Sequence, residues 1–431
     1  MKLIIDNKLL YFKNIETLLV ALMASTIPFK LNLGNVTIIV SVLYALFLLI
    51  KGKVPLRNFR AFYFLIPITL FLIAVVSALM SKDITEGILQ LDKLLLMVLI
   101  PFVLSVFKGR NINVLKVFYT FSIGVTVATT ILLAINLFKI IKGAPTRQLF
   151  FFDFTMLYDQ HPVYFSITIV LSIFFLIHYF LVKGSKLLQL KLVYFFLAIH
   201  LLGLIFCASK AVIFCFFVLL LLYVLINKKK VSRKTLLLTF GILLLGITSV
   251  IFVPHIEERF SSGLVYNSKD FTPTVDLLKA KKFTYEEKSN ISDLELRLIF
   301  FKIGLFHTIQ DGKVLFGYGL GDVQHYLDYY YMSYNLAPNW YEGFNLHNQY
   351  LQFLVTYGVF AFLLFVFYLL YSLDISIRTN NIIHLFFMIM ILFVFIFEVY
   401  LARNKGIVLL FFFNTLFLTQ KFRFEDSHIR N

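Results

Sequence analysis

Apolar residues along the chain come in long uninterrupted runs and do not alternate with polar ones. Stretches such as 64–76, 216–226 and 359–370 contain almost nothing polar, and most of them extend into longer apolar segments. A helix needs about 20 apolar residues to cross the hydrocarbon core of a bilayer. Only helices or closed barrels satisfy their backbone groups in lipid, and these runs are too long for barrel strands. The pattern therefore predicts an all-α, polytopic membrane protein.

We expect twelve transmembrane helices. They are predicted at 16–30, 33–50, 61–80, 87–107, 114–138, 162–182, 190–208, 210–227, 235–253, 348–373, 382–400 and 406–419. The chain thus divides into helices 1–9 (1–253), one large loop (254–346) and a part with helices 10–12 and a tail (347–431). No inverted repeat of the kind found in many transporters is evident in the sequence.

Composition supports this class. Of the 431 residues, 60% are hydrophobic and only 15% charged, against about 25% charged in a soluble protein. The two cysteines, Cys207 and Cys215, lie inside apolar runs, which favours small buried side chains over a disulfide or a zinc site. A net charge of +17 is also typical of nucleic-acid binding. Here the basic residues are dispersed through short loops, so we expect membrane lipids and no nucleic acid as partners.

The distribution of lysine and arginine predicts the orientation, because short cytoplasmic loops are enriched in both. Basic residues collect before the first span, at 51–60, at 108–110, at 183–191 and at 228–234. The alternate loops are poorer in them, except for the loop after the fifth span, at 139–147. Both termini are therefore predicted in the cytoplasm, and loop 254–346 on the opposite side, in the periplasm.

The large loop contains the only tryptophan, Trp340, and a tyrosine-dense patch at 326–341. These aromatic side chains fit either stacking on sugars or a belt at the membrane interface. Within the loop, Ser292 and Glu295 form a capping-box pattern that predicts a helix ending at Asp311-Gly312. Five apolar residues recur along this helix at helical spacing and predict a face that lies on the membrane or on other helices: Leu294, Leu298, Phe301, Leu305 and Ile309.

Three features in and after this loop are candidates for chemistry. Arg297, in the second turn of the helix, is either a binding residue or an exposed arginine at the interface. The turn Gly317-Tyr318-Gly319-Leu320-Gly321 permits close backbone approach, or is only flexible; its spacing is not that of a dinucleotide fingerprint. His347-Asn348, at the start of the tenth span, provides either a general base or a helix cap.

Other polar residues stand at the ends of spans. Lys210 lies between the seventh and eighth spans, His161 opens the sixth, and Glu398 lies near the outer end of the eleventh. His178, His200 and His384 lie on apolar faces without metal-ligand spacing and are interpreted as packing residues. No motif for a metal or a nucleotide is found, so we expect no cofactor and no metal.

The order of these motifs resembles the O-antigen ligase and O-antigen polymerase superfamily. The resemblance rests on twelve spans with a large late loop, on Arg297, on the turn 317–321 and on His347 with the residues after it, to Gln352. It implies an enzyme of the bacterial inner membrane, acting without a metal at the periplasmic face. Such enzymes transfer a glycan from an undecaprenyl-diphosphate carrier to the hydroxyl of an acceptor such as lipid A–core.

The resemblance also implies roles for residues. Arg297 would bind the diphosphate and His347 would orient or deprotonate the acceptor, so these two are the catalytic candidates. Lys210 stands where the family usually has an arginine, and this departure leaves a point charge in place of a bidentate fork. The substrate-binding candidates are Lys210, His161, Asn348, Gly319 and Gly321.

Three other functions compete with a ligase. A polymerase needs the same diphosphate clamp and hydroxyl acceptor, so the sequence does not separate the two. A transporter or flippase of lipid-linked sugars predicts charges along a path through the membrane, whereas the charged candidates here gather at the outer mouth. A structural scaffold leaves Arg297, His347 and the glycine-rich turn without a purpose.

Overall fold

The computed structural model describes residues 14–182, 190–228 and 271–420, together with Phe12 and single positions between 240 and 261. Its regular elements are all helical within these ranges, as predicted. The ninth predicted span (235–253) and the first part of the large loop lie mostly outside the described residues.

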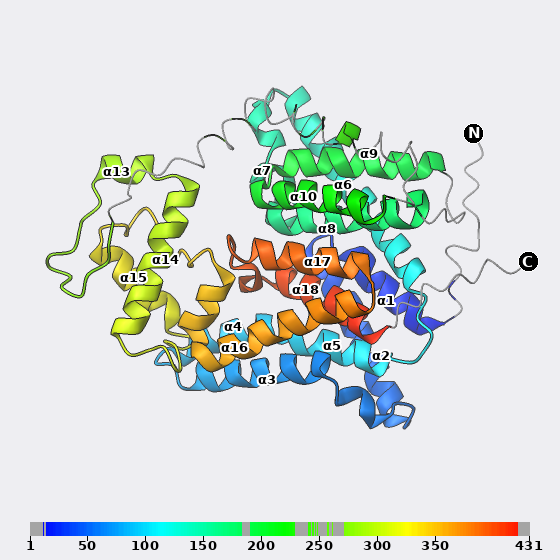
Figure 1. Cartoon of the computed structure of the whole chain (residues 1–431), viewed down its shortest axis with the longest axis horizontal. Coiled ribbons are helices and arrows are strands. Elements are labelled where there is room, and N and C mark those ends of the chain that lie inside the picture. The colour runs from blue at the N-terminus through cyan, green and yellow to red at the C-terminus, as the bar shows by residue number, and fades with distance from the viewer. Residues whose placement is uncertain are drawn as a thin grey trace, which may run out of the picture.

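Two groups of helices form the bundle (Figure 1). The first group consists of α1 (Ile15–Thr26), α2 (Leu31–Ile50), α3 (Phe62–Leu79), α4 (Ile84–Leu94), α5 (Leu96–Val106), α6 (Val114–Ile141), α8 (Pro162–Leu176), α9 (Leu190–Cys207) and α10 (Lys210–Ile226). The second group follows the lobe described below and consists of α16 (Gln349–Arg378), α17 (Ile382–Val394) and α18 (Asn404–Thr419).

Seven helical segments of the described chain are long and apolar enough to cross a membrane. They are α2, α3, α4 with α5, α6, α8 with the turn after it, α9 and α16; α1, α10, α17 and α18 are apolar but shorter. The predicted span 87–107 is interrupted at Leu95, where α4 gives way to α5. The structure thus confirms a polytopic helical protein, while the count of twelve stays a prediction.

Helix α8 forms the centre of the bundle. It contacts α6, α9, α10, α17 and α18, and every one of its residues is buried. A span surrounded by other helices needs small side chains where backbones approach and partners for its polar groups. Ser172 meets both needs, because its hydroxyl donates a hydrogen bond to the Ser122 hydroxyl of α6 at 2.8 Å.

Loops predicted on the cytoplasmic side meet at one end of the bundle. The Asn14 amide donates to the backbone oxygen of Arg110, and the Arg110 guanidinium contacts the Glu16 carboxylate at 3.2 Å. The same guanidinium donates to the backbone oxygen of Lys53 at 2.8 Å. These contacts place the start of α1 and the loops after α2 and α5 together, as the lysine and arginine pattern requires.

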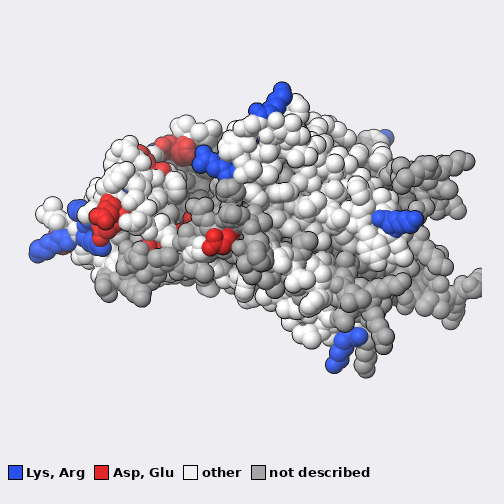
Figure 2. All heavy atoms as spheres, turned by 90° about the horizontal axis from the view of Figure 1, so that it is seen from above, with Lys and Arg blue, Asp and Glu red and all other residues white. Residues whose placement is uncertain are grey.

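A lobe of three helices lies at the other end of the bundle (Figure 1). It contains α13 (Tyr285–Asn290), α14 (Asp293–Gln310) and α15 (Val323–Ser333). Figure 2 shows acidic and basic side chains together at the lobe end of the visible face, and only scattered basic ones over the rest. The molecule therefore consists of an apolar helical bundle with a polar lobe at one end.

Helix α14 has the predicted bounds. The Ser292 and Glu295 side chains form the capping box, and the helix ends at Asp311. Its buried side is formed by Ile299, Phe300 and Ile303, whereas Leu298, Phe301 and Ile309 of the predicted apolar face are exposed. Most of the predicted face therefore does not pack on other helices of the described chain, and its contact with the membrane stays a prediction. Both sides of this helix are apolar, so spacing alone does not show which side the aromatic residues of the lobe cover.

The glycine-rich turn fastens the lobe to the bundle. The Leu320 N–H donates to the Ser77 hydroxyl at 2.9 Å, and the Gly321 N–H donates to the Ser81 hydroxyl at 3.0 Å. The carboxylate of Asp322 accepts the N–H groups of Lys82 and Asp83 at 2.8 and 2.9 Å, just before α4. These bonds give the turn a specific place between α3 and α4.

A break inside α16 accommodates the same turn. Gly358 has φ +80° and ψ −179°, a conformation open only to glycine. A Cβ on Gly358 would overlap the backbone oxygen of Leu315, and one on Gly317 would overlap that of Thr356. The two glycines therefore permit close contact between the turn and the helix.

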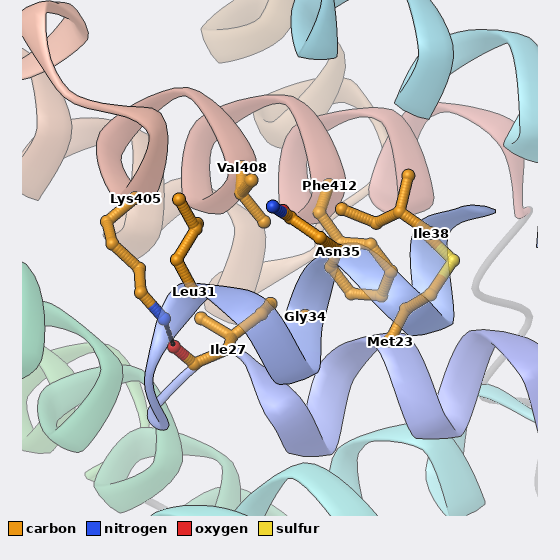
Figure 3. A pocket seen from close by; sticks show the side chains of 9 residues that line it. All are labelled: Met23, Ile27, Leu31, Gly34, Asn35, Ile38, Lys405, Val408 and Phe412. Atoms are coloured by element: carbon orange, nitrogen blue, oxygen red, sulfur yellow. Dashed lines mark hydrogen bonds between the residues drawn. The ribbon is translucent and has the colours of Figure 1, made fainter. Parts of the chain in front are cut away.

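A small apolar hollow lies between α1, α2 and α18 (Figure 3). At one end of it the Lys405 amine donates to the backbone oxygens of Ile27 and Phe29, which satisfies the C-terminus of α1. Lys405 is buried, so its amine lies in the interior of the bundle and contacts backbone oxygens there.

Candidate functional site

The segment between α17 and α18 passes over the start of α16. The sequence predicts a span to residue 400, but α17 ends at Val394 and residues 395–403 are mostly non-helical. The Gln349 N–H donates to Phe395 O at 2.8 Å, and the Gln349 side-chain oxygen accepts the Leu401 N–H at 2.6 Å. The start of α16 thereby fixes both ends of this crossing segment.

Asn348 contributes to the same attachment. Its side-chain oxygen accepts the Leu351 N–H at 2.9 Å and caps α16, while its amide donates to Ile396 O at 3.2 Å. Both contacts are structural. The sequence pattern Asn348-Gln349 therefore positions the segment that carries Glu398.

Arg297 reaches from α14 to this segment. Its Nε donates to Phe397 O at 3.0 Å, its Nη1 to Asp293 O at 2.7 Å, and its Nη2 lies 3.4 Å from Glu398 Oε1. The two charged side chains are three-quarters buried. The guanidinium is therefore held at the junction of lobe and bundle and does not extend into solvent. Three of its five N–H groups have partners among the described residues, and two remain for a ligand.

His347 lies on the other side of the same carboxylate. Its Nδ1 is 3.8 Å from Glu398 Oε2, which is an ion-pair distance and too long for a hydrogen bond. Its backbone has φ +48°, and its N–H donates to the Asn345 side-chain oxygen at 2.9 Å. The imidazole lies parallel to the Phe300 ring at 6.2 Å. The positive φ of His347 and the neighbouring Phe300 ring thus fix the direction of the imidazole.

The electrostatics of Glu398 follow from these neighbours. Burial raises the pKa of its carboxyl group, but His347, His161 and Arg297 favour the charged form and outweigh burial, so the pKa is lowered. Glu398 is therefore a carboxylate at neutral pH. A charged group in a mostly buried position of this kind is typical of functional sites, although structural ion pairs produce the same effect.

His161 completes the group from α8. It caps that helix, with its Nδ1 accepting the Val163 N–H at 3.2 Å. Burial lowers the pKa of His161 to about 4; Glu398 opposes this shift, and the positive charges of Arg403, His347 and Arg297 add to it. His161 is thus neutral at pH 7 and within electrostatic reach of the other four.

Residues 193–366 match the family model described as O-antigen ligase. This stretch of the chain belongs to the O-antigen ligase family. Members of the family are membrane glycosyltransferase-like enzymes of the ligase or polymerase type. No curated protein matches the chain significantly.

The stretch of the chain that matches the O-antigen ligase model includes Arg297 and His347 but ends before Glu398 and Arg403. The sequence alone indicates Glu398 only as a charge near the outer end of a span, and it does not single out Arg403. The available signal was a carboxylate followed five residues later by an arginine, directly after an apolar run. Only the fold shows that this pair lies beside residues 100 positions away.

The structure places the remaining candidates differently. Lys210, at the start of α10, contacts the Asp293 carboxylate at 2.9 Å, and Asp293 is the residue whose backbone oxygen holds Arg297. Lys210 is thus connected to Arg297 through Asp293 and does not contact Arg297 itself. Gly319 and Gly321 lie against Ser81 and Asp83 of the bundle, where they serve the docking of the lobe.

The described residues contain no group of three or more His, Cys, Asp or Glu side chains placed to hold a metal ion. In the cluster of Arg297, His347, Glu398, His161 and Arg403, the two arginines are cations, Glu398 is an anion and His161 is neutral. The arginines outnumber the carboxylate, so the chemistry of the cluster fits an anionic ligand.

Proposed function

We propose that the protein transfers a glycan from an undecaprenyl-diphosphate carrier to an acceptor hydroxyl at the periplasmic face of a bacterial inner membrane. The observation that carries this proposal is the arrangement of Arg297 and His347 on the two oxygens of one carboxylate, Glu398. This arrangement lies where the lobe meets the ends of the membrane helices, so a lipid-borne substrate reaches it from the bilayer. The family match supports the same reaction class.

In this proposal the reaction is a single displacement. The acceptor hydroxyl gives its proton to Nε2 of His347, and its oxygen forms a bond to the anomeric carbon of the donor. The bond between that carbon and the diphosphate oxygen breaks, and the carrier diphosphate leaves with the electron pair. Since the diphosphate is already a good leaving group, positioning and charge stabilisation supply most of the rate.

Each side chain has one task. Glu398 faces Nδ1 of the imidazole and orients the ring, as a carboxylate does in other acid–histidine pairs. Arg297 offers its two remaining N–H groups to the diphosphate as a fork. Arg403 is exposed directly before α18, and its positive charge acts on His161. His161 is neutral at pH 7 and adds no charge to the site.

We propose lipid A–core as the acceptor, which makes the protein a ligase. The pattern of lipopolysaccharide from a deletion strain tests this point. Loss of a ligase leaves free core and accumulated carrier-linked polymer, whereas loss of a polymerase leaves core with a single repeat. The second pattern would replace the ligase with the polymerase. A transporter is disfavoured because the charged cluster lies at one end of the bundle.

The assignment of His347 is tested by complementation of that strain. We expect His347→Ala to abolish transfer at an unchanged level of membrane protein. His325→Ala is the matched control, because this histidine lies on α15, is exposed and lies 3.3 Å from the exposed carboxylate of Asp83. Normal transfer by the His347 variant would refute the role of His347.

The orientation is tested by labelling introduced cysteines with an impermeant reagent in spheroplasts. The two native cysteines are buried, so they give little background. We expect labelling at Leu278→Cys in the lobe, where the native side chain is 95% exposed, and none at Lys53→Cys. The reverse pattern would place the cluster in the cytoplasm.

A further inference from the structure

A row of aromatic side chains leads from His347 along the surface of the lobe. Ring centroids are 5.9 Å apart between His347 and Phe344, and 5.6 Å apart between Phe344 and Tyr341. Tyr341 lies 6.1 Å from Trp340, and Trp340 lies 5.4 Å from Tyr285. We call the four aromatic residues after His347, that is Phe344, Tyr341, Trp340 and Tyr285, the aromatic track.

The rings of the aromatic track are held in place and still partly open. Lys288 is buried, and its amine lies 5.5 Å from the centre of the Trp340 ring. The Tyr341 hydroxyl donates to Lys288 O at 3.2 Å. At the far end, the Tyr285 side chain is 76% exposed. Aromatic rings fixed in this way offer binding area at little cost in conformational entropy.

The surroundings of the track are polar. Tyr285 begins α13, whose capping box joins Thr284 and Glu287, and Glu287 also pairs with Lys281 at 2.9 Å. Exposed Glu286 and Glu342 follow Tyr285 and Tyr341 in the sequence. A surface lying in lipid would make each of these charges costly. The track therefore faces an aqueous ligand.

A different surface of the lobe, which is apolar, has the features of a lipid contact. Phe316 is 77% exposed, and its neighbour Leu315 is exposed too. Their turn packs on the end of α3, where Leu79 and Met80 expose apolar side chains. The apolar surface around Phe316 is therefore the edge of the lobe that faces the membrane, and it is distinct from the aromatic track with its charged surroundings.

We propose that the aromatic track binds the sugar chain of the acceptor and leads its reactive hydroxyl to His347. The apolar C–H faces of pyranose rings stack on the aromatic rings, and the sugar hydroxyls bond to polar groups at the rim such as Asn345 and Glu342. The proposal rests on the glycan transfer proposed above. It adds a row of acceptor subsites outside the reacting centre.

Trp340 provides a direct test, because it is the only tryptophan of the chain. Its emission is followed in the full-length protein in lipid nanodiscs, with core oligosaccharide released from lipopolysaccharide by mild acid as the probe. We expect a saturable change in emission. Tyr285→Ala should weaken binding roughly tenfold (about 1.4 kcal/mol). Tyr329→Ala, an exposed tyrosine of α15 outside the track, should leave binding unchanged.

Nanodiscs with brominated lipids test the competing location. If the track lies in the membrane interface, these lipids quench Trp340, and the proposal is overturned. We expect no quenching by brominated lipid at Trp340. In the same nanodiscs a tryptophan introduced as Phe316→Trp, in a Trp340→Phe background, should be quenched.

Steady-state transfer separates this proposal from the proposed function. Tyr285→Ala should raise KM for the acceptor roughly tenfold with kcat nearly unchanged, and Tyr285→Phe should restore it. Unchanged emission of Trp340 in a preparation that transfers glycan would overturn the track alone. Saturable binding of the oligosaccharide by a protein that transfers no glycan would overturn the proposed function and leave the track standing.

Discussion

The Glu398 carboxylate lies 3.4 Å from the Arg297 guanidinium, across 101 residues of sequence. The contact joins the lobe to the bundle, because Arg297 belongs to α14 and Glu398 to the segment after α17. The same carboxylate faces His347 at 3.8 Å. A single acidic side chain thus sets the positions of an arginine and a histidine that come from different elements.

Removal of the arginine should cripple transfer without unfolding the protein. We expect Arg297→Ala to lose about 10²–10³ in rate, which corresponds to roughly 3–4 kcal/mol of transition-state stabilisation. Arg297→Lys should rescue poorly, because an ammonium cannot reproduce the planar fork. The control is Arg378→Ala, whose exposed guanidinium pairs with Asp374 within α16. Transfer is normalised to membrane protein by immunoblot; near-normal transfer by Arg297→Ala would contradict its role.

Protonation of His161 should destabilise the fold in mild acid. Its folded-state pKa, about 4, lies below the ordinary value of 6.5, so the folded protein binds fewer protons between these values. The contribution of a neutral His161 is complete above pH 6.5 and is lost as the pH falls towards 4. We expect a loss on the order of 1–2 kcal/mol between pH 7 and pH 5.

The comparison for this loss is His161→Asn, because asparagine also caps a helix but does not titrate. Thermal unfolding of the purified protein at pH 7 and pH 5 gives the measurement. The wild type should lose more stability on acidification than the variant. Equal losses would show that His161 is accessible to protons in the folded state.

The glycines of the turn should matter for docking of the lobe. A Cβ on Gly321 would overlap the backbone oxygen of Asp83, so we expect Gly321→Ala to lower the amount of folded protein. The same is expected of Gly358→Ala, which also has to adopt a positive φ. Gly34→Ala in α2 is the control, since a Cβ there meets nothing within 4 Å. Full yield with a selective loss of transfer would instead support substrate binding by the turn.

The three histidines interpreted as packing residues all have polar partners: His178 contacts Tyr223, His200 contacts Thr126 and His384 contacts Asn414. His384 Nε2 lies 2.9 Å from the Asn414 side-chain oxygen, and the Asn414 amide donates to the Ser372 hydroxyl at 2.8 Å, all in the buried bundle. His384→Ala leaves Asn414 short of a partner and should cost about 1–3 kcal/mol of stability. Transfer per folded molecule should stay normal, as measured after correction for the protein level. His384→Gln, which keeps a polar group, should be milder.

Local signals in the sequence were enough for much of the fold. Runs of apolar residues located eleven of the predicted spans on helices, and the Ser292–Glu295 capping box predicted both ends of α14. Both patterns depend on neighbours within one or two helical turns. The cluster itself depends on contacts between distant segments. From the sequence alone, Glu398 is therefore only a charge near the end of a span, and the side of α14 that the lobe buries cannot be distinguished from its other apolar side.

The pair of Lys210 and Asp293 permits the last test, which separates a positioning role from a binding role. Lys210 holds Asp293 at 2.9 Å, and the backbone oxygen of Asp293 holds Arg297 at 2.7 Å. We infer that Lys210 acts on the site through α14, by fixing the first turn of the helix that carries Arg297. A lysine that binds the diphosphate directly would have to give up this carboxylate.

Charge reversal distinguishes the two roles. Lys210→Asp alone places two carboxylates together and should reduce transfer roughly tenfold or more. The double variant Lys210→Asp with Asp293→Lys restores an ion pair of opposite sense, and we expect it to recover most of the lost rate. Transfer in the deletion strain, at matched protein level, is the measurement. A double variant as inactive as Lys210→Asp would show instead that the positive charge at position 210 contacts the substrate itself.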